Sequence, residues 1–374
     1  MNMQISKNIL VAPLNWGLGH ATRCIPIINA ILANGDNPII ASDGMALELL
    51  KKEFPRLEFI ELPSYEISYP EKGQFLKLKL LKDSPKIWAA IRREHLMLSE
   101  LIARYHLDGV ISDNRLGLYN KMIPSVIITH QLQVLSGTTT WLSTQLHLHY
   151  IKKFDYCWIP DVDHVQNLSG LLSQHHDDDI FKVYLGPLSR FKINTSSQIK
   201  FKYDLMVLLS GPEPQRSILE RKLLKEVKEF NGEVLFIAGN VRGKQQMEKK
   251  GDITYYNYLS TEGLQKAFDR SDIILSRSGY TTIMDLHKLG KRAFFIPTPG
   301  QFEQEYLAQS LDDQGIVPFA TQDNFEIKML ERVDSYKGLK SVYSSTTTSI
   351  SDILSETFSN VNENSDPIPG SLST

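Results

Sequence analysis

The 374-residue chain carries 41 Lys and Arg residues against 43 Asp and Glu residues, a net charge of −2, and 42% of its residues are hydrophobic. This balance is typical of an ordinary folded protein, and the length favours two domains. The small net charge argues against a dedicated nucleic-acid binder, and no apolar run approaches the roughly 18 residues that span a bilayer. The first residues lack the architecture of a signal peptide, and the two cysteines exclude a disulfide framework and a four-thiolate zinc site. We therefore expect a soluble cytoplasmic protein.

Short apolar strands alternate with helical patterns along the first half of the chain. Apolar runs predict strands at residues 8–13, 38–42, 108–113, 125–129 and 156–159. Between the first two, residues 25–34 place four apolar side chains on one helical face: Ile27, Ile28, Ile31 and Leu32. Strands of this kind, separated by helices, predict a parallel sheet covered on both faces.

The same alternation restarts after a polar stretch at residues 192–200. Further strands are predicted at residues 205–209, 233–239, 272–276 and 293–297. The fold class is therefore α/β, with two Rossmann-like, doubly wound domains at residues 1–188 and 189–330. Within residues 331–374 we expect a helix that packs back on the body, followed by a flexible tail. Ligands of such sheets bind beyond the carboxyl ends of the strands, so the residues that follow each strand are the candidate site.

The loop after the first strand carries Gly17, Gly19 and His20. The two glycines let the backbone turn tightly and approach a ligand, and the helix that follows offers free N–H groups. His20 is a candidate general base because its ordinary pKa lies near neutral pH, and Asp113, at another strand end, is the candidate carboxylate that orients it. The alternative is a tight turn with a helix-capping histidine.

Two further side chains follow the predicted strand at residues 125–129. His130 and Gln131 are candidates for contact with an acceptor substrate, because this strand end belongs to the same predicted sheet edge.

The most informative stretch runs from Ser276 to Ala308. Arg277, Ser278 and Gly279 open a helix that continues through Tyr280 and Thr281, and small residues at a helix start let amides and hydroxyls bind phosphate oxygens. About two turns into that helix, a carboxylate could accept both hydrogen bonds of a ribose diol, and the polar side chains after the next strand suit a sugar ring. These residues are Asp285, then Gln301, Glu303 and Gln304. We expect the crevice between the domains to hold a sugar pyrophosphate here; the alternative is a capped amphipathic helix followed by a polar loop.

Over most of residues 8–310, these motifs resemble the nucleotide-sugar-dependent glycosyltransferases of the GT-B fold, in particular the MurG-like branch of glycosyltransferase family 28. The resemblance implies that the stretch at Arg277 to Gly279 binds the donor diphosphate and that Asp285, where the family more often has Glu, binds the ribose. It implies donor-sugar contacts for Glu303 and Gln304, and a phosphate loop at Ser210 and Gly211, although Pro212 and Pro214 leave that loop poor in glycine.

Relatives of this family that act on small molecules carry a His base after the first strand and a supporting Asp about a hundred residues later. His20 and Asp113 match that spacing.

The expected activity is inverting, metal-independent transfer of a sugar from a nucleoside diphosphate sugar to an acceptor hydroxyl. A UDP-sugar is favoured by the resemblance alone; it serves as substrate, and no cofactor is expected. The Asp161-Val162-Asp163 triplet matches a metal-binding pattern of the other glycosyltransferase fold, but we interpret it as a turn. Two rival functions are a nucleotide-sugar epimerase on the same fold and a non-catalytic sugar-nucleotide binding protein.

Residues 72–93 form a basic and apolar-rich segment in the predicted acceptor domain. Such a segment can lie on an anionic membrane surface, here the inner face of the membrane, where a lipid-linked acceptor would arrive. An ordinary helix pair with a charged outer face is the alternative, and a polysaccharide or small-molecule acceptor stays open. The segment has one acid, Asp83, and seven basic residues: Lys72, Lys77, Lys79, Lys82, Lys86, Arg92 and Arg93.

Overall fold

The computed structural model describes residues 6–66, 76–164, 166–175, 177–194, 201–211, 213–241, 243–342 and 349–359. The first sheet has seven parallel strands in the order β3-β2-β1-β4-β5-β6-β7. Its strands are β1 (Asn8–Pro13), β2 (Asn37–Ser42), β3 (Glu58–Glu61), β4 (Gly109–Asp113), β5 (Ser125–Ile128), β6 (Tyr156–Ile159) and β7 (Lys182–Tyr184). The connecting helices are α1 (Leu18–Ala33), α2 (Gly44–Glu53), α3 (Leu76–Tyr105) and α4 (Thr140–Ile151), with short 3₁₀ turns at Gly137–Thr139 and Gly170–Leu172.

Side chains of successive strand residues pack on opposite faces of this sheet. Ile9 and Val11 of β1 belong to the core under α1 and α2, whereas Leu10 and Ala12 belong to the core under α3. Both sets are buried, because helices cover both faces, and this explains why β1 is apolar from Ile9 to Pro13.

The second sheet has six strands in the order β10-β11-β9-β8-β12-β13, and all but β10 are parallel. Its strands are β8 (Tyr203–Leu208), β9 (Val234–Ile237), β10 (Met247–Lys250), β11 (Ile253–Tyr256), β12 (Ser271–Ser276) and β13 (Arg292–Phe295). Its helices are α5 (Gln215–Glu226), α6 (Thr261–Asp269), α7 (Tyr280–Leu289) and α8 (Phe302–Asp313), with 3₁₀ turns at Val227–Glu229, Ile327–Ser335 and Leu339–Ser341.

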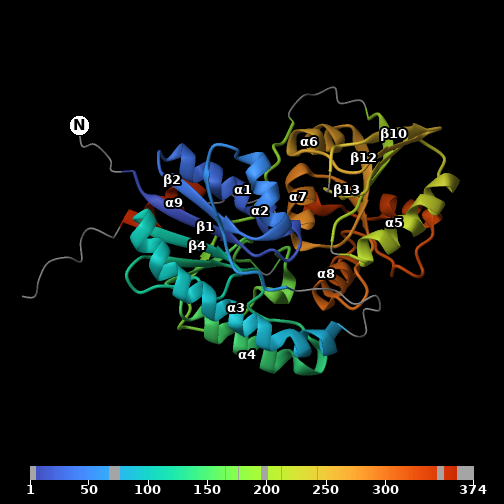
Figure 1. The fold of residues 1–374 in the computed structure, drawn as a ribbon. Helices are drawn as coiled ribbons and strands as arrows, with labels where there is room; N and C mark the ends of the chain where they lie inside the picture. Colours follow the sequence, from blue (N-terminus) through green and yellow to red (C-terminus); the bar gives the residue numbers. More distant parts are fainter. Residues whose placement is uncertain are drawn as a thin grey trace, which may run out of the picture.

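The two sheets lie side by side, and the chain returns to the first one at its last described helix. Helix α1 packs against α7 of the second domain. Helix α9 (Ile350–Ser359) packs against α1, where Nζ of Lys7 donates to the carbonyl oxygen of Phe358 at 2.7 Å. In Figure 1 this red helix lies among the blue elements of the first domain, away from the other red and orange segments.

The predicted alternation of strands and helices is confirmed, and the two parallel α/β sheets make the GT-B fold class correct. The exact domain boundaries stay predictions, and the predicted tail at residues 363–374 lies outside the described residues. Two details differ from expectation. Helix α1 begins at Leu18 and includes His20, and four short strands at the sheet edges or next to one were not predicted: β3, β7, β10 and β11.

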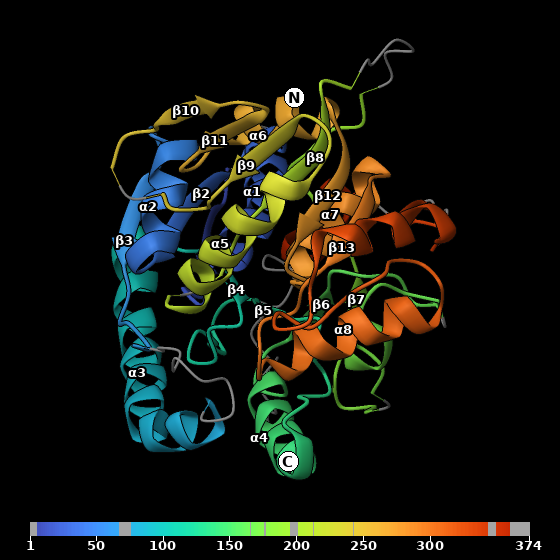
Figure 2. The ribbon, with the colours of Figure 1, turned by 90° about the vertical axis from the view of Figure 1, so that its right-hand side faces the viewer.

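Helices α3 and α4 lie on the same side of the first domain, at the bottom of Figures 1 and 2. None of the described helices is both long and apolar enough to cross a membrane. Of the basic segment at residues 72–93, positions 72–75 lie outside the described residues, and only the side chains from Asp83 onward are described.

Candidate active site

The pairing of β1 with β4 brings His20 and Asp113 together. The two strands are parallel neighbours in a register that sets Pro13 beside Asp113, so both end at the same edge of the sheet. The chain then turns at Gly17, whose φ of 84° favours glycine, and begins α1 with His20 in its first turn. Nδ1 of His20 lies 2.8 Å from Oδ1 of Asp113. Nδ1 also lies 2.9 Å from Nη2 of Arg23, but that nitrogen already donates to Asp113. We assign the proton to Nδ1 from its contact with the carboxylate, which only accepts, and this tautomer leaves Nε2 as the basic nitrogen.

A buried arginine that the sequence analysis missed holds Asp113 in its charged form. Arg23 lies three residues after His20 on the same face of α1, and its Nε and Nη2 donate to the two carboxylate oxygens of Asp113. Burial by itself would raise the pKa of Asp113, but the charges of Arg23 and His20 hold it well below its ordinary value. Asp113 is therefore a fixed anion that can orient His20 over a wide pH range. The signal in the sequence was a charged residue within an otherwise apolar helical segment.

His130 and Gln131 follow β5, the next strand along the edge, and both contact Glu303 of the second domain. Nη1 of Arg23 donates to Nδ1 of His130 across 3.2 Å, so the proton of a neutral His130 lies on Nε2, which donates to Glu303 at 3.0 Å. Nε2 of Gln131 donates to the other carboxylate oxygen of Glu303. Burial lowers the pKa of His130, which favours the neutral ring. His130 and Gln131, predicted on the acceptor side, thus directly contact Glu303, which was predicted to bind the donor sugar.

Tyr280 and Thr281, at the start of α7, also reach across to the first domain. The Tyr280 hydroxyl donates to Oδ2 of Asp161 at 2.7 Å, and its ring stacks on His130 with 4.1 Å between ring centroids. Oγ1 of Thr281 donates to the carbonyl oxygen of Gly19 at 3.2 Å. We expected both side chains to bind phosphate. In this structure they join the two domains instead.

The side chain of Arg277 does not face the crevice, contrary to the prediction. The guanidinium is 1% exposed and points into the second domain, where burial lowers its pKa to about 9. Its Nη1 and Nη2 atoms donate to four acceptors, at 2.7 to 3.2 Å: the carbonyl oxygens of Ile296, Pro297 and Gln215, and Oε1 of Gln322. A group so fully occupied holds the loops of the domain together, and its donors are not available to a diphosphate.

Ser278 and Gln304 are likewise used within the second domain. The Ser278 hydroxyl is buried and donates to the carbonyl oxygen of Gln304 at 2.8 Å, while Oε1 of Gln304 accepts from the amide of Thr298 at 2.9 Å. These bonds fix the loop before α8 against the start of α7. The Ser278 hydroxyl is therefore engaged within the protein in this arrangement, and its contact with a phosphate stays a prediction.

The backbone at the start of α7 keeps the features of an anion site. No side chain caps the helix, and a Cβ placed on Gly279 would find no atom nearer than Nε2 of Gln304 at 3.9 Å. Near the start of α8, Oε1 of Gln301 is buried without a hydrogen-bond partner among the described residues. Open space beside uncapped amides, with an unpaired amide oxygen on the neighbouring loop, suits a polar ligand.

Asp285 lies further along α7, against the segment that connects the domains. It is 8% exposed, and the Ser189 hydroxyl donates to its Oδ1 at 2.6 Å. Burial raises the pKa of Asp285 to about 6, partly offset by the charge of Arg190. Arg190 itself was missed by sequence reasoning. One of its nitrogens donates to Thr261 at 3.1 Å, while its buried Nε has no partner within the described part of the chain.

The remaining predicted positions lie at the strand ends, as expected, but make few contacts. Ser210 and Gly211 are exposed after β8, next to β12 in the sheet, and Gly211 has a φ of 108° with open space around it. Pro212, named with this loop, lies outside the described residues.

The Asp161-Val162-Asp163 triplet lies in the loop after β6, and Asp161 is committed to protein contacts. Its carboxylate accepts from the amides of Val162, Leu168 and Ser169 as well as from the Tyr280 hydroxyl. Over the described residues, no group of three or more His, Cys, Asp and Glu side chains is arranged to hold a metal ion.

Two more buried polar atoms lack partners, one directly after Asp113 and one beside His130. Asn114, directly after Asp113, has a φ of 59° and a buried Oδ1 with no hydrogen bond among the described residues. Nε2 of His147 on α4 is also buried without a described partner; burial lowers its pKa to about 4, and its ring interacts electrostatically with His130. Unpaired buried polar atoms next to a candidate base are typical of a site that completes its hydrogen bonds with a substrate.

Two α/β domains that meet with their strand-end side chains in contact define a GT-B architecture with the candidate site at the domain interface. Residues 215–337 match the model of the Glycosyltransferase family 28 C-terminal domain. An uncharacterised glycosyltransferase of Methanosarcina mazei is 24% identical over 82% of this chain and 84% of its own length. The UDP-N-acetylglucosamine–N-acetylmuramyl-(pentapeptide) pyrophosphoryl-undecaprenol N-acetylglucosamine transferase of Haemophilus ducreyi is 22% identical over 87% of this chain and 88% of its own length.

Among solved structures, MurG of Acinetobacter baumannii superposes with a TM-score of 0.55 at 13% identity, covering 94% of this chain and 99% of that one. This likeness supports the fold, and the family model and the relatives support the chemistry. The chain is a glycosyltransferase of the GT-B fold that is similar to MurG, and its residues 215–337 match the C-terminal domain of family 28.

Proposed function

We propose that the protein transfers a sugar from a nucleoside diphosphate sugar to an acceptor hydroxyl with inversion, and that His20 is the general base. The contact between Nδ1 of His20 and Asp113 carries this proposal, because it leaves Nε2 unprotonated at the interface between the domains. The His20 side chain is 14% exposed, so a substrate hydroxyl can reach it, whereas Asp113 is fully buried. In this direct displacement, His20 takes the proton of the hydroxyl, whose oxygen attacks the anomeric carbon opposite the leaving diphosphate.

The proposed donor site uses backbone amides of α7 and the side chain of Arg190, instead of the side chain of Arg277 that the sequence indicated. Arg277 is occupied, so Arg190 is the better candidate to offset the diphosphate charge, with its unpaired Nε and its position beside Asp285. The uncapped amides at the start of α7, the helix that carries Asp285, would also stabilise negative charge, and no metal ion is required by this scheme. Asp285 would accept from the ribose diol, and Gln301 and Glu303 from hydroxyls of the sugar.

A UDP-sugar is the proposed donor, because the Haemophilus ducreyi relative is named for UDP-N-acetylglucosamine. In this arrangement Glu303 is bonded to His130 and Gln131, so the donor sugar would have to replace these bonds. Opening of the domain interface therefore precedes donor binding in the proposed cycle.

The first domain is the proposed acceptor side. Asn114, directly after Asp113, and His147, which interacts with His130, offer unpaired polar atoms, and such atoms suit an acceptor rich in hydroxyl groups. We also propose that the protein acts at the inner face of the membrane, through the described part of the basic segment, where Trp88 is half exposed and Arg92 and Arg93 are exposed. Sedimentation with anionic vesicles that weakens as salt rises would support this contact, and absence of binding would refute it.

A ligand screen followed by a turnover assay tests the proposed reaction. Thermal unfolding across nucleoside diphosphates and their sugars identifies the donor, since a ligand of the native state raises the Tm. With that donor and a set of polyprenyl-phosphate, oligosaccharide and small-molecule acceptors, His20→Ala should lose turnover and keep its affinity for the nucleotide. His149→Ala, at an exposed position of α4, is the matched control.

Three outcomes contradict the proposal. Conversion of the donor in the absence of any acceptor would indicate an epimerase. Full turnover by His20→Ala would remove His20 as the base. Loss of turnover on addition of a chelator, restored by a divalent cation, would refute the metal-independent scheme.

A further inference from the structure

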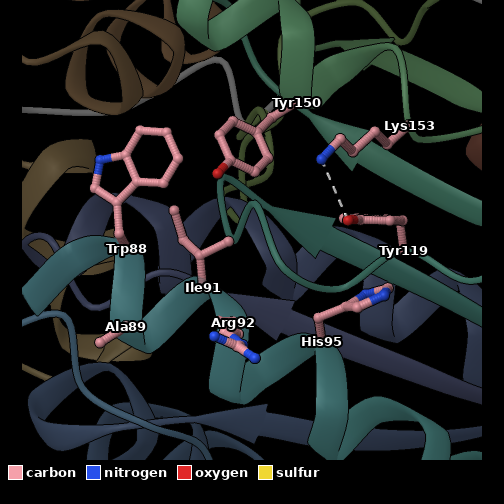
Figure 3. A pocket seen from close by; sticks show the side chains of 8 residues that line it. All are labelled: Trp88, Ala89, Ile91, Arg92, His95, Tyr119, Tyr150 and Lys153. Atoms are coloured by element: carbon pink, nitrogen blue, oxygen red, sulfur yellow. Dashed lines mark hydrogen bonds between the residues drawn. The ribbon is translucent and has the colours of Figure 1, made fainter. Parts of the chain in front are cut away.

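A pocket apart from the candidate active site lies on the first domain, between α3, the end of α4 and the loop that follows β4. It has a volume of about 470 Å³. Its walls are mainly aromatic: Trp88 meets Tyr150 edge to face with 6.0 Å between centroids, and His95 stacks on Tyr119 at 4.3 Å. Figure 3 shows these rings around the hollow, with the Lys153 amine and the Tyr119 hydroxyl directed toward one another. Their separation is 3.4 Å.

Two cations of this pocket have no acidic partner. Neither Arg92 nor Lys153 forms an ion pair within the described ranges, and the Lys153 ammonium is instead held over the Tyr150 ring, 4.6 Å from its centroid. The neighbouring acids are used elsewhere: Glu94 pairs with the buried Arg115, and Asp177 and Asp179 pair with Lys152. The pocket therefore keeps a net positive charge beside apolar walls, which is the complement of an anion attached to an apolar group.

An exposed apolar stripe on α4 leads away from the pocket. Leu142, Leu146 and Tyr150 follow one another at intervals of four residues, so they lie on one face of the helix, and Leu142 and Leu146 are 62% and 42% exposed. From Tyr150 to Leu142 this stripe extends about 12 Å along the helix axis. Its length and exposure suit an apolar chain whose charged end lies between Arg92 and Lys153.

The floor of the pocket belongs to the loop that continues from Asp113. Tyr119 lies in this loop, and Nδ1 of His95 donates to the carbonyl oxygen of Gly117 at 3.2 Å. A Cβ on Gly117 would lie 2.2 Å from the carbonyl oxygen of Ile91, so the loop packs closely on α3. An occupant of the pocket would thus rest on the segment that carries the catalytic carboxylate.

We propose that this pocket binds the phosphate head of a lipid phosphate ester, with its apolar chain against Trp88 and the Leu142–Leu146 stripe. The phosphate accepts from Arg92, Lys153 and the Tyr150 hydroxyl at the centre of the pocket. This site goes beyond the proposed transfer reaction, because its occupation needs neither a sugar donor nor His20. It is a defined site, in contrast to diffuse attraction between the basic segment and a charged membrane.

Calorimetric titration of the full chain with decyl phosphate below its micelle-forming concentration tests the proposal. Saturable binding is expected, about tenfold tighter than that of inorganic phosphate, which lacks the chain, and of decyl maltoside, which lacks the charge. Lys153→Gln, Arg92→Gln and Trp88→Ala should each weaken binding by about threefold to tenfold. Arg104→Gln removes the same charge from an exposed position in the last turn of α3, which does not line the pocket, and should leave binding unchanged.

The positions changed are exposed or half exposed, so the variants are expected to fold, and their unfolding curves check this. Equal affinity for decyl phosphate and decyl maltoside would overturn the proposal. So would an effect of Arg104→Gln as large as that of Arg92→Gln, since both results would indicate non-specific attraction. The titration contains no sugar nucleotide, so its failure and the failure of the transfer reaction are separate results.

Discussion

Nδ1 of His20 and Oδ1 of Asp113 lie 2.8 Å apart although 93 residues separate them in the chain. The parallel register of β1 and β4 produces this contact, since it sets the ends of the two strands side by side. Helix α1 places Arg23 beside the same carboxylate, and its charge neutralises that of Asp113. Without Asp113, Arg23 would be a buried charge without a partner. The His20–Asp113 pair is thus part of a buried ionic group that includes Arg23, and a change in one of these three residues affects the other two.

Replacement of Asp113 by Asn should damage both activity and stability. An amide orients His20 poorly and leaves Arg23 with an unpaired buried charge, so we expect turnover to fall by about a hundredfold or more and the free energy of unfolding by roughly 3 kcal/mol. Turnover and urea unfolding measure the two effects. Asp179→Asn, at an exposed ion pair, should change neither. Wild-type turnover by Asp113→Asn would show that the contact has no catalytic role.

A methyl group at Gly19 should hinder closure of the domains. The added Cβ would lie 2.9 Å from Oγ1 of Thr281, closer than such atoms normally approach. We expect Gly19→Ala to lower kcat/KM by roughly tenfold to a hundredfold, with little change in the unfolding of either domain. Because Thr281→Ala removes the clashing oxygen, adding Gly19→Ala to that variant should cost little more. An undiminished effect in the double variant would contradict the steric explanation.

The buried Asp285 should make stability depend on pH between its unfolded and folded pKa values. Its pKa is raised from 3.8 to about 6, mainly by burial, so the protonated form is favoured in the folded state. The stability that Asp285 contributes is therefore full below about pH 4 and is lost as the pH rises toward and beyond 6. Asp285→Asn should gain up to roughly 2 to 3 kcal/mol relative to wild type between pH 4 and pH 7.

Urea unfolding of both proteins at several pH values measures this difference. Ser189→Ala is a useful companion, because it removes the hydroxyl that donates to Asp285 and should raise the pKa of the carboxyl further. If the difference between wild type and Asp285→Asn does not change from pH 4 to pH 7, the raised pKa is refuted.

Replacement of Arg277 by Met should mainly lower stability, whereas replacement of Arg190 by Met should mainly weaken nucleotide binding. Arg277→Met leaves several buried carbonyl oxygens without a donor, so the free energy of unfolding should fall by about 2 to 4 kcal/mol. Arg190→Met should instead weaken binding of the nucleoside diphosphate by about tenfold with a smaller effect on stability. Titration of both variants with the nucleotide, at a temperature where each is folded, separates the roles. Unchanged nucleotide affinity in Arg190→Met would exclude it from the donor site.

The sequence predicted the central strands well, because β1, β4, β5 and β12 each have a run of buried apolar residues at their centre. It did not predict β10, whose four residues are all exposed, Met247 to Lys250. An edge strand of this kind is defined by its hydrogen bonds to β11, and a short charged segment carries no apolar pattern that would reveal it.

Site prediction succeeded where strand ends decide the position and failed where side-chain direction decides it. His20 and Asp113 meet because their strands are neighbours. Arg277 follows a strand end as well, but its long side chain turns back toward the carbonyl oxygens of its own domain. Spacing along the chain cannot distinguish these two directions, and it gives no sign that Tyr280 would cross to Asp161.

The return of α9 to the first domain has a mechanical consequence. The chain crosses between the domains twice, once between β7 and β8 and again between the Leu339–Ser341 turn and α9, which is fastened to α1 and Lys7. A body attached at two points can rotate about the line that joins them, while translation and free twisting are restrained. The double connection therefore restrains how far the two domains can separate, and cutting the chain before Ile350 would remove one of the two restraints.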